Sequence, residues 1–284
     1  MIICLHIPKT GGTSFRFILE NSFGVFNCHT NQTNRSTFTE ADLRFVKKFF
    51  PGLRSITGHN IVDPTELRVK NPFYATILRE PVARVISHYQ YSVQRGNNQA
   101  SFEESLRRSE NLENLQTKLI AGGRDIEKAK RFLAQSHFVG LTEKFDLSLR
   151  VLERLSPWKL NLHYKKKVVA SDYQVKESVQ RDERMLELAR EYNKLDIELY
   201  EFARKEIFPA LCQKAGVNPN EPVPSYATYR HERLPKYQVG RFYNRMFRQI
   251  CKFRYQVLMR DPRPLLGNVA EDIFAPLLQK TARF

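Results

Sequence analysis

The chain opens with Ile2-Ile3-Cys4-Leu5-His6-Ile7-Pro8-Lys9-Thr10-Gly11-Gly12-Thr13-Ser14, and this stretch decides the fold. Its first part is an apolar run with the length and composition of a fully buried strand. Apolar residues return from Phe15 onward at spacings that one face of a helix would bury. A glycine-rich turn between a strand and a helix can hold an anion, because its N–H groups and the helix dipole point at negative charge. The stretch therefore predicts an anion-binding loop with Lys9 beside it.

The order of residues separates this loop from the Walker A loop of nucleotide triphosphatases. Walker A places its lysine directly after the last glycine, whereas Lys9 precedes Gly11 and Gly12. Taken alone, the segment is also compatible with an ordinary strand-to-helix turn that carries a surface lysine.

A second strand-to-helix junction follows at residues 73–89. Residues 73–78 form another apolar run typical of a buried strand, and Pro81 suits the first turn of a helix. Arg79 then lies at the carboxyl end of the strand and Ser87 within the helix. Ligands of open α/β sheets bind at the carboxyl ends of the strands. The structural alternatives are a salt bridge to a nearby acid for Arg79 and a tolerated helix serine for Ser87.

Together the two motifs resemble those of sulfotransferases that use 3′-phosphoadenosine 5′-phosphosulfate (PAPS), in the carbohydrate branch related to heparan sulfate 2-O-sulfotransferase. The resemblance covers roughly residues 1–208, with supporting matches at 114–117, 139–145 and 195–202. It implies that the 5′-phosphosulfate is held by the first loop, which consists of Lys9, Thr10, Gly11, Gly12, Thr13 and Ser14. It also implies that Arg79 and Ser87 bind the 3′-phosphate and that adenosine 3′,5′-bisphosphate (PAP) is the product.

Two further assignments rest on the same resemblance. Transfer to a hydroxyl needs a base, and histidine titrates in the useful range. Related 2-O-sulfotransferases carry their catalytic histidine in a Gly-His pair, which implies that His59 is the base and Lys9 neutralises the leaving oxygen. Asp63 or Glu66 is the alternative base. Lys166, within the basic run 165–167, is assigned to the 3′-phosphate, although such a run is also typical of a solvated turn.

Metal chemistry has no signature in the sequence. The four cysteines are far apart and form no Cys-x2-Cys pair, and no His-Glu-x2-His motif occurs. The chain begins on a strand without a signal peptide, and no apolar run is long enough to cross a membrane. We therefore expect no metal, reduced cysteines and a cytoplasmic, soluble bacterial protein.

The pattern of elements predicts an α/β, P-loop-like three-layer fold, with a central parallel sheet flanked by helices and a helical C-terminal extension. We expect a catalytic domain at residues 1–208 and a basic extension at 209–284. Further helices are predicted at 39–50, 125–135, 142–155 and about 176–208, and a capping box at 101–104 predicts the start of another. A short strand is predicted at 160–164.

The net charge is +16 and is concentrated near the C-terminus, where residues 230–263 contain ten Lys or Arg against two acids. Within 240–259, the pattern is that of a basic amphipathic helix. Its basic residues are Arg241, Arg245, Arg248 and Lys252, and its apolar residues, on another side, are Phe242, Met246, Ile250, Phe253 and Val257. Such a helix either packs on the core, contacts an acidic surface such as the inner face of the membrane, or binds an anionic acceptor.

The acceptor is the least determined part of the hypothesis. A carbohydrate, a glycolipid or another molecule with a hydroxyl group fits equally, because acceptor-binding residues lie on loops. Two other classes are weaker alternatives: a nucleotide kinase or NTPase of related fold, and a basic nucleic-acid-binding protein. The isoelectric point near 9.8 permits the latter, but no DNA- or RNA-binding motif is visible, so we expect no nucleic acid partner.

Overall fold

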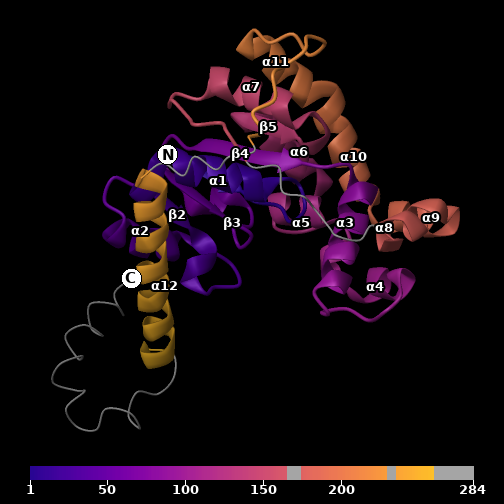
Figure 1. Ribbon diagram of the computed structural model, residues 1–284, viewed down its shortest axis with the longest axis horizontal. Helices are drawn as coiled ribbons and strands as arrows, with labels where there is room; N and C mark the ends of the chain where they lie inside the picture. Colours follow the sequence, from indigo (N-terminus) through magenta and orange to yellow (C-terminus); the bar gives the residue numbers. More distant parts are fainter. Residues whose placement is uncertain (165–173, 229–234, 259–284) are drawn as a thin grey trace.

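The computed structural model describes residues 1–164, 174–228 and 235–258. Its centre is a five-stranded parallel sheet with the order β2-β3-β1-β4-β5 (Figure 1). The strands are β1 (Ile2–Leu5), β2 (Asn27–His29), β3 (Ser55–Gly58), β4 (Phe73–Leu78) and β5 (Phe138–Leu141). The predicted α/β class with a parallel central sheet is therefore confirmed.

Helices cover both faces of the sheet, as a parallel sheet requires. The α-helices are α1 (Gly12–Phe23), α2 (Glu40–Phe49), α3 (Pro81–Gln94), α4 (Phe102–Arg108), α5 (Leu115–Ala121), α6 (Ile126–Gln135), α7 (Phe145–Leu155), α8 (Gln174–Arg181), α9 (Glu183–Tyr192), α10 (Lys194–Phe202), α11 (Phe208–Ala215) and α12 (Pro235–Leu258). Short 3₁₀ or π turns are η1 (Gly24–Phe26), η2 (Thr30–Thr33), η3 (Pro64–Leu67), η4 (Glu110–Leu112), η5 (Thr142–Lys144) and η6 (Ala203–Ile207).

Alternation along β1 shows the three layers most directly. Ile3 and Leu5 enter a core cluster shared with α2, α5, α6 and α10, whereas Ile2 and Cys4 enter a second cluster with α1. Side chains of a strand point alternately to its two faces, so both faces of the central strand are buried. The all-apolar start of the chain is therefore explained by its position in the middle of the sheet.

The prediction of one long helix at about 176–208 is wrong, because the structure has several shorter helices in this range. The chain breaks at Asp182, which caps α9 by accepting the Met185 N–H, and at Asn193, whose side-chain amide donates to the carbonyl of Leu112. The end before Pro209 is also wrong. Pro209 lies in the first turn of α11, directly after the π turn η6, so the helical segment that begins with α10 continues past it.

The short strand expected at 160–164 is reduced to one isolated bridge, between Tyr164 and Ala227. The helix expected at 142–155 begins with the 3₁₀ turn η5 and becomes α-helical at Phe145. The helices at 39–50 and 125–135 are confirmed within a residue or two. At 101–104 only half of the capping box forms, because Glu104 pairs with Arg108 instead of turning back.

The predicted basic helix at 240–259 begins earlier, at Pro235, and packs along the edge strand β2 (Figure 1). Gly240 permits the close approach of α12 to η1, since an added Cβ would lie 2.5 Å from the backbone of Gly24. Farther along, Phe247 is inserted among aromatic rings of α2 and belongs to the main core cluster. The division into domains at residue 208 stays a prediction.

Asn244 of α12 completes the hydrogen bonding of the sheet edge. Its amide donates to the carbonyl of Asn27 at 2.9 Å, and its oxygen accepts the N–H of His29 at 3.1 Å. These are two backbone groups on the side of β2 that has no neighbouring strand, and buried backbone groups need partners. Among the described residues, no helix is both long and apolar enough to span a membrane.

Candidate functional site

Three loops meet at the carboxyl edge of the sheet, because β3, β1 and β4 are parallel neighbours. The loop after β3 carries His59, the loop after β1 carries Lys9, and the loop after β4 carries Arg79. Sequence reasoning identified these residues one motif at a time. The sheet order places the three loops side by side at one edge.

The loop after β1 is held in a tight turn. Lys9 and Gly11 both have left-handed backbone conformations, with φ of 72° and 84°. The Thr10 hydroxyl donates to the carbonyl of Ile7 at 3.0 Å, and the Thr142 hydroxyl lies 2.8 Å from the carbonyl of Thr10. α1 then begins at Gly12, and the first N–H groups of a helix have no acceptor within it. The turn has the form of an anion cradle.

Gly12 is required by a neighbouring histidine. A Cβ at this position would lie 1.8 Å from Cδ2 of His6. His6 itself is 4% exposed, and its ring packs against that of His59 with centroids 4.0 Å apart. A larger residue at position 12 would displace His6, and with it the ring of His59 that packs against His6.

Arg79 joins the first two motifs. Its Nη1 donates to the carbonyl of Lys9 at 3.0 Å, while its own backbone is bonded in both directions by the side chain of Gln116. Within the described part of the chain, no carboxylate lies within 4.0 Å of the guanidinium. Glu80, the neighbouring acid, instead caps α3. The salt-bridge alternative for Arg79 is therefore not what the structure shows.

Lys9 points at α3. Its Nζ lies 4.2 Å from the centre of the Tyr91 ring, a distance typical of a cation–π contact. Ser87, the other residue predicted to bind the 3′-phosphate, lies one helical turn before Tyr91 and is half-buried. α3 therefore presents Ser87 and Tyr91 on one face, the face that meets the loop after β1.

Arg84 is a buried cation that sequence reasoning did not assign. It is 0% exposed, and its Nη2 donates to the carbonyl of Asn111 at 3.1 Å. Its Nε and Nη1 have no partner among the described residues. Burial lowers the pKa of this guanidinium to about 10, and the nearby charge of Arg79 acts in the same direction. The available signal was its place in the motif, three residues before Ser87.

The His59 ring has a defined tautomer. Its Nδ1 lies 2.7 Å from the carbonyl of His6, and because a carbonyl only accepts, Nδ1 carries the proton and Nε2 carries the lone pair. Desolvation lowers the pKa of His59 below its ordinary value, partly offset by this hydrogen bond. Taken as a whole residue, His59 is nevertheless exposed. Burial therefore favours the neutral imidazole, with its lone pair on Nε2.

The nearby histidines are also neutral. Burial lowers the pKa of His88 to about 4, with the charges of Arg84 and Lys9 acting in the same direction, and lowers that of His29 to about 3.

The two alternative carboxylate bases differ in burial and in ion pairing. Asp63 is buried and its carboxylate pairs with Lys128 at 2.6 Å, whereas Glu66 is exposed. The choice of base stays a prediction.

Two other sequence predictions concern Lys166 and metal binding. Lys166 lies outside the described residues, so its assignment to the 3′-phosphate stays a prediction. In the described ranges, no cluster of three His, Cys, Asp or Glu side chains is arranged to hold a metal ion. All four cysteines are buried, and none of them forms a disulfide within those ranges.

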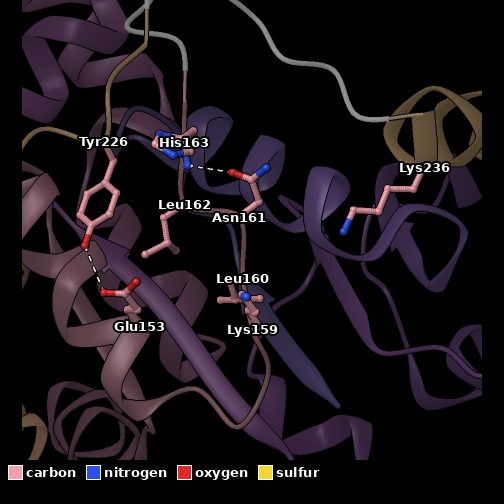
Figure 2. A pocket seen from close by; sticks show the side chains of 8 residues that line it. All are labelled: Glu153, Lys159, Leu160, Asn161, Leu162, His163, Tyr226 and Lys236. Carbon is pink, nitrogen blue, oxygen red and sulfur yellow. Dashed lines mark hydrogen bonds between the residues drawn. The ribbon is translucent and has the colours of Figure 1, made fainter.

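A separate pocket of about 410 Å³ lies between the segment at 159–163, Tyr226 and the start of α12 (Figure 2). Its lining residues are Glu153, Lys159, Leu160, Asn161, Leu162, His163, Tyr226 and Lys236. In the figure the Tyr226 hydroxyl points to Glu153, a contact of 3.3 Å. None of the predicted donor-binding residues that the structure describes lines this pocket.

Comparison with known proteins shows what the part of the chain that carries this edge is similar to. Residues 1–125 match the model of the sulfotransferase family. This range contains both loops joined by Arg79, and the resemblance inferred from the motifs is thereby confirmed. The chain is 30% identical over 155 residues to heparan sulfate 2-O-sulfotransferase hst-2 of Caenorhabditis elegans. The alignment covers 49% of this chain and 46% of that protein, so the chain spans about half the length of the curated relative it matches.

Proposed function

We propose that the protein transfers a sulfuryl group from PAPS to a hydroxyl of an acceptor, a carbohydrate or a glycolipid. The observation that carries the proposal is the hydrogen bond from Arg79 Nη1 to the carbonyl of Lys9. It joins, at one sheet edge, the two motifs that are separated by almost seventy residues and that the family match covers. The name of the relative in Caenorhabditis elegans supports a carbohydrate acceptor.

The residues at the edge suit the donor. PAPS carries two anionic groups, and the site offers a positive-φ turn at a helix N-terminus together with two cations, Arg79 and Arg84, that contact no carboxylate of the described residues. Buried guanidinium nitrogens without partners are costly unless an anion or water satisfies them. In this proposal the turn and Lys9 hold the phosphosulfate, while Arg79 and Ser87 hold the 3′-phosphate.

In this proposal two side chains act in the reaction: His59 as the base and Lys9 as the cation beside the leaving group. His59 Nε2 accepts the proton of the acceptor hydroxyl as its oxygen forms the new bond to sulfur. The bond between sulfur and the 5′-phosphate oxygen breaks, and PAP leaves with that electron pair. The Lys9 ammonium stabilises the charge on the departing oxygen, which requires its movement from the Tyr91 ring. Positioning and electrostatics account for most of such catalysis.

The tautomer supports His59 as the base. Since Nδ1 donates to the carbonyl of His6, the ring accepts a proton only at Nε2, and the same bond stabilises the imidazolium that forms. Asp63 is a weaker candidate, because protonation would break its pair with Lys128.

Calorimetry with four ligands tests the proposal: PAP, adenosine 5′-phosphate, ATP and a duplex oligonucleotide. We expect PAP to bind most tightly, because only PAP carries both the 5′-group and the 3′-phosphate. Tight binding of ATP but not of PAP would indicate a kinase or NTPase. Tight binding of the duplex alone would indicate a nucleic-acid-binding protein. Either result would overturn the proposed function.

A further inference from the structure

The surface of α12 has three distinct faces. The face that packs on the sheet edge consists of Tyr237, Gly240, Asn244, Phe247 and Cys251, all of which are buried. A second face carries five apolar residues in solvent, and a third carries the basic residues. The helix therefore packs on the core and still keeps an apolar face exposed.

The exposed apolar face follows the helical repeat without interruption. Its members are Val239, Phe242, Met246, Ile250 and Phe253, with exposures of 56%, 63%, 46%, 38% and 57%. They recur every three or four residues, so they form one stripe along the helix. Of the seven large apolar residues exposed in the described chain, these are five. A contiguous apolar surface of this kind marks an interaction site.

The basic face lies beside the apolar stripe. Arg241, Arg245, Arg248 and Lys252 recur at the same three- and four-residue spacings and are all exposed. The sequence of α12 from Pro235 to Leu258 contains no Asp or Glu. Positive charge along this helix is therefore not compensated by acids of the same helix. Its partner must accept apolar side chains and must be anionic.

We propose that α12 docks the protein on an anionic lipid surface. The apolar stripe enters the boundary between headgroups and acyl chains, and the basic residues contact the lipid phosphates. A polysaccharide or nucleic acid would match the charge but not the apolar stripe. A second copy of the chain would match the stripe but would bring two basic faces together.

The course of α12 relates this surface to the candidate site. The helix contacts η1, before β2, and η2, after β2, so it runs toward the carboxyl edge of the sheet (Figure 1). Asn31 of η2 in turn accepts the His59 N–H at 2.9 Å. Docking through α12 would therefore bring the loops of the site close to the lipid surface. Docking itself does not depend on the proposed sulfuryl transfer.

Vesicle co-sedimentation of the full chain tests docking. The probes are phosphatidylcholine vesicles with and without phosphatidylglycerol. We expect binding only to the anionic vesicles. Replacing Arg241, Arg245 and Arg248 by glutamine should weaken it on the order of a hundredfold, or about fivefold for each charge. Replacing Phe242 and Phe253 by glutamine should weaken binding at least tenfold while leaving the melting temperature unchanged.

Two control variants separate the helix from general charge and hydrophobicity. Arg108, Arg181 and Arg184, exposed on α4, α8 and α9, are replaced by glutamine to remove the same charge elsewhere. Phe26→Gln removes an exposed phenylalanine from η1. Both controls should bind as the wild type does.

Three outcomes would contradict the proposal. The first is equal vesicle binding by wild type and by both α12 variants. The second is binding to soluble polyanions but not to vesicles. The third is a lower melting temperature or a changed molecular mass for the Phe242 and Phe253 variant, since the stripe would then be covered by protein.

Discussion

Arg79→Ala should selectively weaken recognition of a 3′-phosphate. The guanidinium has five N–H donors, and its hydrogen bond to the carbonyl of Lys9 uses one of them, on Nη1. Because no carboxylate contacts it among the described residues, its charge is available to a ligand. A hydrogen bond to a charged group contributes about 1.5–3 kcal/mol. The dissociation constant for PAP should therefore rise by about 10- to 150-fold.

The assay is calorimetry of wild type and Arg79→Ala with PAP and with adenosine 5′-phosphate, which lacks the 3′-phosphate. Binding of the second ligand should change little. Arg181→Ala, an exposed arginine on α8, is the control for loss of one positive charge. An equal loss for both ligands would refute the reasoning, because Arg79 would then act only by supporting the loop at Lys9.

Three further predictions concern catalysis, pH and stability. Lys9→Ala should lower kcat by about 10²–10³, the effect of removing one transition-state donor; a variant that keeps more than roughly a tenth of wild-type turnover would exclude the role. Desolvation lowers the pKa of His59 below 6.5, so kcat/KM should be flat near neutral pH and fall only below that value, as the imidazole becomes charged; a profile without this acidic limb contradicts a histidine base. Asn244→Ala leaves the carbonyl of Asn27 and the N–H of His29 without partners, so urea unfolding should show a loss of about 2–5 kcal/mol; a loss under about 0.5 kcal/mol would mean that water replaces the amide.

The two strand-to-helix junctions could be predicted because their signals are local. Apolar runs, glycines and Pro81 define β1, the loop, β4 and α3 without reference to distant residues. That the loops meet could not be read from either motif, since their contact depends on β1 and β4 being neighbours. Only the sheet order brings Arg79 to the carbonyl of Lys9, seventy residues earlier.

The break at Asp182 has a local cap, but the break at Asn193 depends on partners far away in the chain. Asn193 accepts the N–H of Asn114, and Asp196, which is 0% exposed, accepts the N–H groups of Gln116 and Thr117. These residues are about eighty positions apart. A periodicity argument sees only helix-forming residues in this region, so it merges several helices into one.

The face that α12 buries could not be predicted from hydrophobicity. Four of the five apolar residues found in the sequence, Phe242, Met246, Ile250 and Phe253, belong to the exposed stripe. The buried face instead includes Gly240, selected by the close approach to Gly24, and Asn244, selected by the open edge of β2. β2 was missed for the same reason: two of its three residues, Asn27 and His29, are polar, and their partners come from the other end of the chain.

Transfer of labelled sulfate from PAPS tests the central claim most directly. The assay incubates the full chain with labelled PAPS and a fraction of carbohydrates and glycolipids, followed by separation of the labelled products. Wild type should label an acceptor, whereas His59→Ala should bind PAP normally, melt at the wild-type temperature and transfer about 10²–10⁴ times more slowly. Glu66→Gln should remain active. No labelled acceptor with wild type, or equal labelling by wild type and His59→Ala, would contradict the account.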